Sequence, residues 1–157
     1  MKKAAFVAFA IVLSLSLSPL VLFAQTQADE EELVKSTLQT GKKEIIVDNM
    51  GFTEDESKAF WPVYDEFQQA KQKLNERTIK VIKDYLDSYE TITNERAEAL
   101  LKEYMAIEKE RADLKSAFLP KFTKVLPAKK VARYYQIENK LEAIVKYELA
   151  KDVPLVK

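Results

Sequence analysis

The chain has 157 residues, with 25 basic and 25 acidic side chains, no Cys and no His. This composition excludes disulfide bonds, the usual ligands of zinc and copper and nucleophilic catalysis that depends on a Cys or a His base. The chain contains only two glycines and is rich in Glu, Lys, Ala and Leu, which predicts an all-α fold built from long helices.

Residues 1–28 have the layout of a secretory signal peptide. Lys2 and Lys3 precede an apolar run over residues 4–23, and small residues follow at Ala24 and Ala28. We expect cleavage after Ala24 or Ala28 and export to the periplasm, which leaves 23 basic against 25 acidic residues. The alternative is that the apolar run stays as a membrane anchor, since it approaches the roughly 20 residues that a spanning helix needs.

Residues 29–157 are predicted to form a single helical domain. The first helix is expected over residues 29–49, with Gly51 as a left-handed cap. Thr53 and Glu56 then form a capping box for a second helix that runs to about residue 89. Its inward positions recur at spacings of three and four: Phe60, Tyr64, Phe67, Lys71, Leu74, Thr78, Val81 and Tyr85.

Two prolines fall within predicted helices. Pro62 is expected to kink the second helix, because the inward positions continue in phase on both sides of it; the alternative is that a short helix ends there. The third helix begins at Thr93, has Arg111 among its inward positions and is interrupted near its end by Pro120. A fourth helix follows Pro127 and extends to about residue 150.

The starts of the second and third helices resemble each other at an offset of 40 residues, so residues 52–74 and 92–114 form an internal pseudo-repeat. The stretches FTEDE and ITNER, at residues 52–56 and 92–96, resemble the LTxxQ motif of the Spy- and CpxP-type periplasmic chaperones. Phe52 and Ile92 stand in place of Leu, and Glu56 and Arg96 in place of Gln. Because Arg96 cannot accept a backbone hydrogen bond, the second capping box is not expected to close.

The resemblance implies a cradle of long bent helices, formed by an antiparallel dimer, that holds unfolding clients without ATP or reports envelope stress to a membrane sensor. The predicted architecture is consistent with this, an elongated bundle of about four helices. Helices of about 50 Å cannot bury all their apolar surface in so thin a bundle, so a homodimer is expected.

The candidate binding surface lies in residues 114–137, which contain six cations and no acidic residue. The cations are Lys115, Lys121, Lys124, Lys129, Lys130 and Arg133, and the aromatic residues Phe118, Phe122, Tyr134 and Tyr135 alternate with them. Rings beside flexible cations suit a surface that contacts both apolar and acidic parts of a partner. The alternative is that the rings belong to the core and the lysines are merely solvated. For Phe60 and Trp61 core packing is favoured over an exposed patch.

These features favour a chaperone or stress adaptor that binds unfolded or partner proteins. Two alternatives stay open: a regulatory module that docks on a membrane sensor, and a structural envelope protein that binds anionic lipid or polymer. No enzymatic activity, cofactor, metal site or nucleic-acid partner is expected, and no membrane segment is expected after signal removal.

Overall fold

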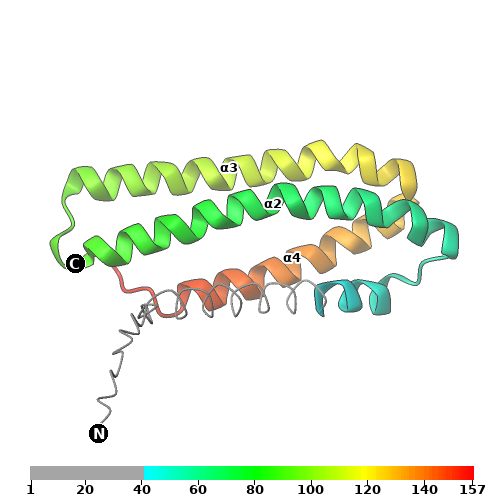
Figure 1. Ribbon diagram of the computed structural model, residues 1–157, viewed down its shortest axis with the longest axis horizontal. Coiled ribbons are helices and arrows are strands. Elements are labelled where there is room, and N and C mark those ends of the chain that lie inside the picture. Colours follow the sequence, from blue (N-terminus) through cyan, green and yellow to red (C-terminus); the bar gives the residue numbers. More distant parts are fainter. Residues whose placement is uncertain (1–40) are drawn as a thin grey trace, which may run out of the picture. The chain divides into compact units, whose positions relative to one another are not determined.

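The computed structural model describes residues 41–157, of which residues 42–157 form one compact unit. Residues 41–50 are helical and are followed by α2 (Glu54–Ser88), the short 3-10 helix η1 (Tyr89–Thr91), α3 (Asn94–Val125) and α4 (Ala128–Ala150). Successive helices run in opposite directions (Figure 1). The predicted all-α bundle is therefore confirmed over the described range. The signal peptide and the first part of the predicted helix 29–49 lie outside it.

The turn between residues 50 and 54 forms as the sequence predicts. Gly51 has φ +55, which a glycine adopts without steric cost. Thr53 then caps α2: its hydroxyl accepts from the Glu56 N–H at 3.2 Å, and the Glu56 carboxylate accepts from the Thr53 N–H at 2.8 Å. Two N–H groups that have no partner within the helix are thereby satisfied.

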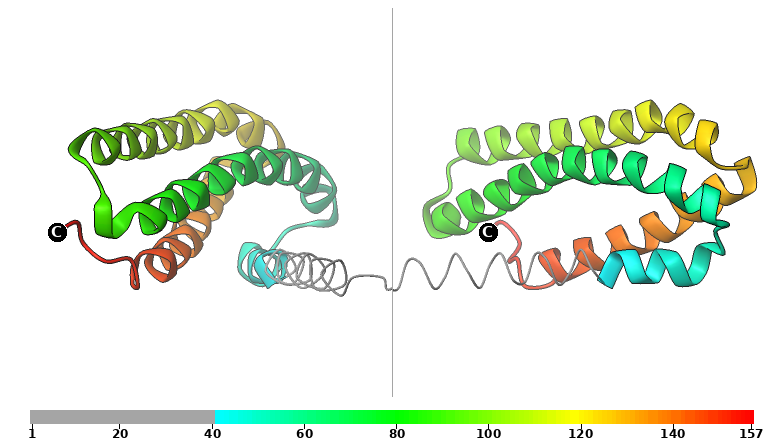
Figure 2. Two further views of the ribbon diagram at one scale, coloured as in Figure 1. Left: turned by 60° about the vertical axis from the view of Figure 1, so that its left-hand side comes forward. Right: turned by 45° about the vertical axis from the view of Figure 1, so that its right-hand side comes forward.

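Neither proline ends its helix. Pro62 lies inside α2, so the alternative of a short helix ending there is wrong. Pro120 lies inside α3, which continues to Val125, so the expected interruption is wrong as well. Both prolines are solvent-exposed, and the carbonyl groups that lose a helical partner on that side can bond to water. Figure 2 shows α2 as one curved rod.

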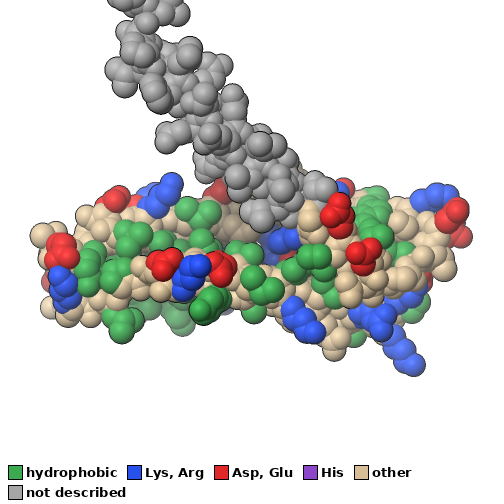
Figure 3. All heavy atoms as spheres, turned by 90° about the horizontal axis from the view of Figure 1, so that it is seen from below, with side chains coloured by type: hydrophobic (Ala, Val, Ile, Leu, Met, Phe, Trp, Pro, Cys, Tyr) green, Lys and Arg blue, Asp and Glu red, His purple; other side chains and the backbone are tan. Residues whose placement is uncertain are grey.

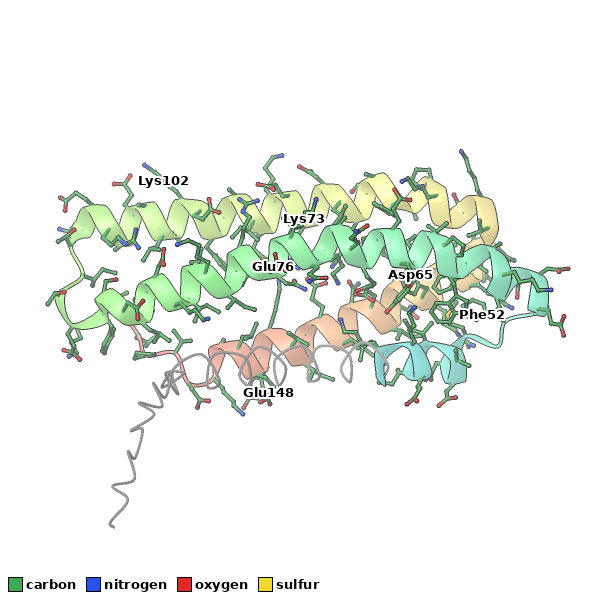
Figure 4. All side chains as sticks on the ribbon, viewed as in Figure 1. Phe52, Asp65, Lys73, Glu76, Lys102 and Glu148 are labelled. Carbon is green, nitrogen blue, oxygen red and sulfur yellow. The ribbon has the colours of Figure 1, made fainter. Side chains whose placement is uncertain are left out.

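The core occupies the end of the bundle where α2 begins and α3 meets α4. Its ten buried residues are Ile46, Met50, Phe60, Tyr64, Phe67, Phe118, Phe122, Leu126, Val131 and Tyr134. Phe52 lies against these rings, 4.8 Å from Phe60 between centroids (Figure 4). Phe60 is fully buried, as expected, while Trp61 is half-buried and donates its indole N–H to the Ser57 hydroxyl at 3.0 Å.

The opposite end of the bundle, which we call the open end, is less completely covered. It is formed by the end of α2, the start of α3 and the end of α4 (Figure 1). The 23 residues of α4 span about 35 Å, against about 52 Å for the 35 residues of α2. The shorter α4 cannot cover the whole length of the α2–α3 pair.

Candidate functional site

The rings of the predicted binding surface are core residues. Phe118, Phe122 and Tyr134 are at most 6% exposed, and Tyr135 is half-buried. Phe122 lies 4.7 Å from Tyr134 between ring centroids, and Phe118 lies 5.1 Å from Phe67. The expectation of an aromatic-lined surface is therefore wrong. These rings fall on the inward sides of α3 and α4, where the rings of α2 complete their contacts.

Four of the six cations in residues 114–137 bind groups elsewhere in the chain. Lys115 contacts Glu142 at 2.8 Å and Lys121 contacts Glu66 at 2.5 Å. Arg133 donates to the carbonyl of Asn49 at 3.3 Å. Of these six cations, only Lys124 and Lys129 make no ion pair or hydrogen bond with the described residues 41–157, so the segment does not present six free charges. The acidic partners come from α2 and from later in α4, outside the segment that the charge count covered.

Lys130 stabilises the start of a different helix. It pairs with the Glu56 carboxylate and donates to the Gly51 carbonyl at 2.7 Å. The hydrogen bond from Lys130, together with that from the Thr53 backbone, lowers the pKa of Glu56. Although the dipole of α4 disfavours a cation in its first turn, this one closes the capping box of α2 from outside. Lys130 was predicted to bind a partner protein, but in the structure it stabilises the start of α2.

The second copy of the motif caps its helix only in part. The Thr93 hydroxyl accepts from the Arg96 N–H at 3.2 Å, as Thr53 does in the first copy. Arg96 pairs with Asp84 of α2 at 3.1 Å instead of returning to the cap, as expected from its chemistry. Ile92 is half-buried just before the cap, at the position that Phe52 holds before α2.

A buried ionic cluster lies between α2, α3 and α4, and sequence reasoning did not identify it as a site. Lys71 and Arg111 are 3% and 5% exposed, and Glu138 is 1% exposed. The members of this polar belt are Lys71, Glu108, Arg111, Lys115, Glu138 and Glu142. The signal was present in the sequence, since Lys71 and Arg111 fall on positions that otherwise carry apolar side chains.

The contacts of the polar belt join α4 to the other two helices. Lys71 of α2 pairs with Glu138 and lies 3.6 Å from Glu142, both on α4. Arg111 of α3 lies 3.5 Å from Glu142 and donates to the Asn75 side chain at 2.8 Å. Every buried charge of the belt therefore has an opposite charge beside it, which is the condition for burying it at tolerable cost.

The pKa is shifted for one member of the belt, Glu142, and for one lysine near it, Lys42. Burial by itself raises the pKa of Glu142, but the hydrogen bond from Lys115 and the charges of Lys71 and Arg111 outweigh it, so the net shift is downward. Burial lowers the pKa of Lys42, with Glu138 acting in the opposite direction. Glu142 is thus held ionised by three cations.

Large apolar side chains are exposed at the open end on all three long helices. We call them the open-end residues: Ile79, Leu86, Leu101, Tyr104, Met105, Ile144, Val145, Tyr147 and Leu149. Leu101 and Met105 are each 61% exposed on α3, and Tyr147 is 66% exposed on α4. In Figure 3 hydrophobic side chains reach the surface between charged ones on the face shown. Lys102 and Glu148 point outward beside these positions on α3 and α4 (Figure 4).

The described residues offer no arrangement for metal chemistry or membrane crossing. In residues 41–157 no three carboxylates are grouped so that they could hold a metal ion. In the same range no helix combines the length and apolar character needed to cross a bilayer.

Comparisons with protein-family models, with curated proteins and with solved structures find no match for this chain.

Proposed function

We propose that the protein is an ATP-independent periplasmic chaperone or envelope-stress adaptor, which binds unfolded or partner proteins through its open-end residues. The observation that carries this proposal is that nine of the twelve large exposed apolar side chains in residues 41–150 lie on α2, α3 and α4 toward one end of the bundle; the other three are Ile45, Val47 and Leu119. Monomeric soluble proteins rarely leave large contiguous apolar patches exposed without a binding role. The signal-peptide layout and the resemblance to Spy- and CpxP-type chaperones support the same function.

The binding chemistry differs from the one that the sequence suggested. The rings of residues 114–137 hold the core together, so the contact with a client falls to the side chains of the open end. Charged residues such as Lys102 and Glu148 are exposed beside them and can attract either sign of charge on a client before apolar contact forms. A chain with two glycines has no glycine-rich loop for a nucleotide phosphate, which is consistent with action without ATP.

Each exposed apolar side chain is expected to contribute only a modest binding free energy to the contact with a client. Fully burying a Leu or Met side chain is worth about 1.5–3 kcal/mol, so the exposed part of Leu101 or Met105 offers about 1 kcal/mol to a client. Two such residues together offer about 2 kcal/mol, which corresponds to about thirty-fold in affinity. Weak contacts of this kind at several positions suit a surface that binds many clients reversibly.

The test is suppression of aggregation of a chemically denatured client by the mature protein. The double variant Leu101→Gln/Met105→Gln is compared with Ala112→Gln/Ser116→Gln, which places the same side chains at exposed α3 positions with the same spacing. We expect the first variant to lose about thirty-fold in potency and the control to keep its potency. Suppression that is absent in the parent protein, or equal in both variants, contradicts the proposal.

The same residues could be covered by a second copy of the chain, which is the expected homodimer. Sedimentation of the parent and of Leu101→Gln/Met105→Gln distinguishes the two uses of the surface. A dimer that dissociates in the variant assigns these residues to self-association. A dimer that persists in the variant while client suppression is lost assigns them to clients.

A further inference from the structure

The C-terminal tail returns to the end of α2 and fastens there. After α4 ends at Ala150, the Pro154 carbonyl accepts a hydrogen bond from the Tyr85 hydroxyl at 2.8 Å. Lys157 then pairs with Glu90 of η1 at 2.5 Å, and its ammonium group lies 5.0 Å from the centre of the Tyr89 ring. The C-terminus accordingly lies beside the junction of α2 and η1 (Figure 1).

The groups that receive the tail can make both apolar and polar contacts with an extended chain. Tyr85 and Tyr89 form an edge-to-face ring pair with centroids 5.8 Å apart, one turn apart on the chain. Their rings offer an apolar surface, the Tyr85 hydroxyl offers a donor to a backbone carbonyl, and Glu90 offers a charge for a cation. Burial raises the pKa of Tyr85, so its hydroxyl stays protonated and able to donate.

The tail contacts this site through two of its groups, the Pro154 carbonyl and the Lys157 ammonium. Val153 and Pro154 are half-buried, whereas Leu155 is 88% and Val156 is 58% exposed. The tail therefore extends from the Tyr85 hydroxyl to Glu90, and the side chains of Leu155 and Val156 between these two contacts lie in solvent. A contact made by one neutral hydrogen bond and one exposed ion pair is readily exchanged for an equivalent one.

We propose that Tyr85, Tyr89 and Glu90 form a binding site for an extended peptide segment, and that the tail fills this site within the same chain. The segment that fits carries a proline or small apolar residue and, three positions later, a lysine. A segment of another protein with this pattern competes with the tail. Because the tail is tethered, its effective concentration is on the order of millimolar, and only an abundant or otherwise attached partner displaces it.

The first test loosens the tail in the full-length mature chain. The variant Val153→Ser/Pro154→Ser/Lys157→Ser retains its length but loses the fitting pattern. We expect amide hydrogen exchange over residues 83–91 to accelerate several-fold, with residues 118–134 of the core unchanged as a measure of folding. Equal exchange rates over residues 83–91 in the parent and the variant overturn the proposal.

The second test adds the acetylated peptide Val-Pro-Leu-Val-Lys to both proteins and follows the NMR signals of the Tyr85 and Tyr89 rings. In the tail variant we expect shifts that saturate at millimolar peptide. In the parent the apparent affinity should be about twofold weaker, because the tail competes at an effective concentration on the order of millimolar. Rings unaffected in the tail variant, or shifts equal in both proteins, overturn the proposal.

Matched charge variants identify the recognising residue. In the background of the tail variant, Glu90→Gln should weaken binding of the peptide at least threefold, whereas Asp87→Asn, which removes a nearby exposed carboxylate that makes no ion pair with the tail, should not. If both variants lose the same affinity for the peptide, the effect comes from the net charge of the region and not from Glu90, which overturns the proposed site. No client protein is involved, so these outcomes are independent of the function proposed for the open-end residues.

Discussion

Replacing Glu138 by Gln should destabilise the fold strongly, because it removes one partner of the most deeply buried ion pair of the polar belt. Glu138 is 1% exposed and pairs with Lys71, which is itself 3% exposed. Removing one partner of such a pair leaves a buried charge without compensation. In proteins in general this lowers the free energy of unfolding by about 3–5 kcal/mol. Lys71 retains Glu142 at 3.6 Å, so we expect a loss of about 3 kcal/mol, at the lower end of that range.

Urea unfolding followed by circular dichroism measures this loss. The matched control is Glu148→Gln, which also removes a paired carboxylate from α4, because Glu148 contacts Lys151 at 2.5 Å. Its side chain is 56% exposed, so the control should lose less than about 1 kcal/mol.

A double replacement separates the pair from the site that holds it. Lys71→Met/Glu138→Leu exchanges two buried charges for apolar side chains of similar volume, which is often neutral or stabilising. We expect the double variant to be at least 2 kcal/mol more stable than Glu138→Gln, on the order of the penalty that the unpaired lysine imposes. A Glu138→Gln loss as small as that of the surface control would refute the claim that the belt is buried between the helices.

Three further results follow from the helix ends and the belt. Thr53→Ala should cost about 1–2 kcal/mol and Thr93→Ala about half of that, because only the first cap is closed reciprocally; urea unfolding of both variants compares them, and equal losses contradict the asymmetry. Gly51→Ala should cost about 1–2 kcal/mol, since its φ of +55 is unfavourable for a side chain although no atom lies within 4 Å; a stability gain would contradict that backbone conformation. The pKa of Glu142 is lower in the folded chain than its ordinary value of 4.5, so its contribution is present above that value and is lost as the pH falls through the lowered pKa. Unfolding measured between about pH 6 and about pH 3 should therefore depend less on pH in Glu142→Gln than in the parent.

The fold could be predicted because its signals are local. The capping box at Thr53, the left-handed Gly51 and the start of α4 after Pro127 each depend on residues within one turn of each other, and each is observed. The effect of the prolines was predicted less well, because α3 continues past Pro120 where an interruption was expected. Whether a helix survives a proline depends on which side of the helix faces solvent, and this is settled by tertiary packing.

The candidate site could not be predicted, because the partners of each group are distant in the chain. Lys121 and Lys130 look like free cations until α2 brings Glu66 and Glu56 beside them. A ring on an amphipathic helix faces either the core or a partner, and periodicity alone does not distinguish the two. The position of Phe122 in the helical repeat is the same whether its ring faces the core or a partner. The ring is buried because rings of α2 pack against it.

The open end was equally hidden in the sequence. Leu101 is next to Leu100, yet the first is 61% and the second 8% exposed. Successive side chains of an α-helix point about 100° apart, so Leu100 can face the other helices while Leu101 does not. A prediction of this exposure needs the lengths of all three helices and their relative alignment.

Site-specific photo-crosslinking tests the central claim most directly. A photoreactive side chain is placed at Met105 or at Ser116, both exposed on α3 but only the first at the open end. Each protein is then irradiated with an unfolded client. We predict a strong crosslinked product from position 105 and little from position 116. Equal capture at the two positions, or none at position 105, would contradict the assignment of the open end as the binding surface.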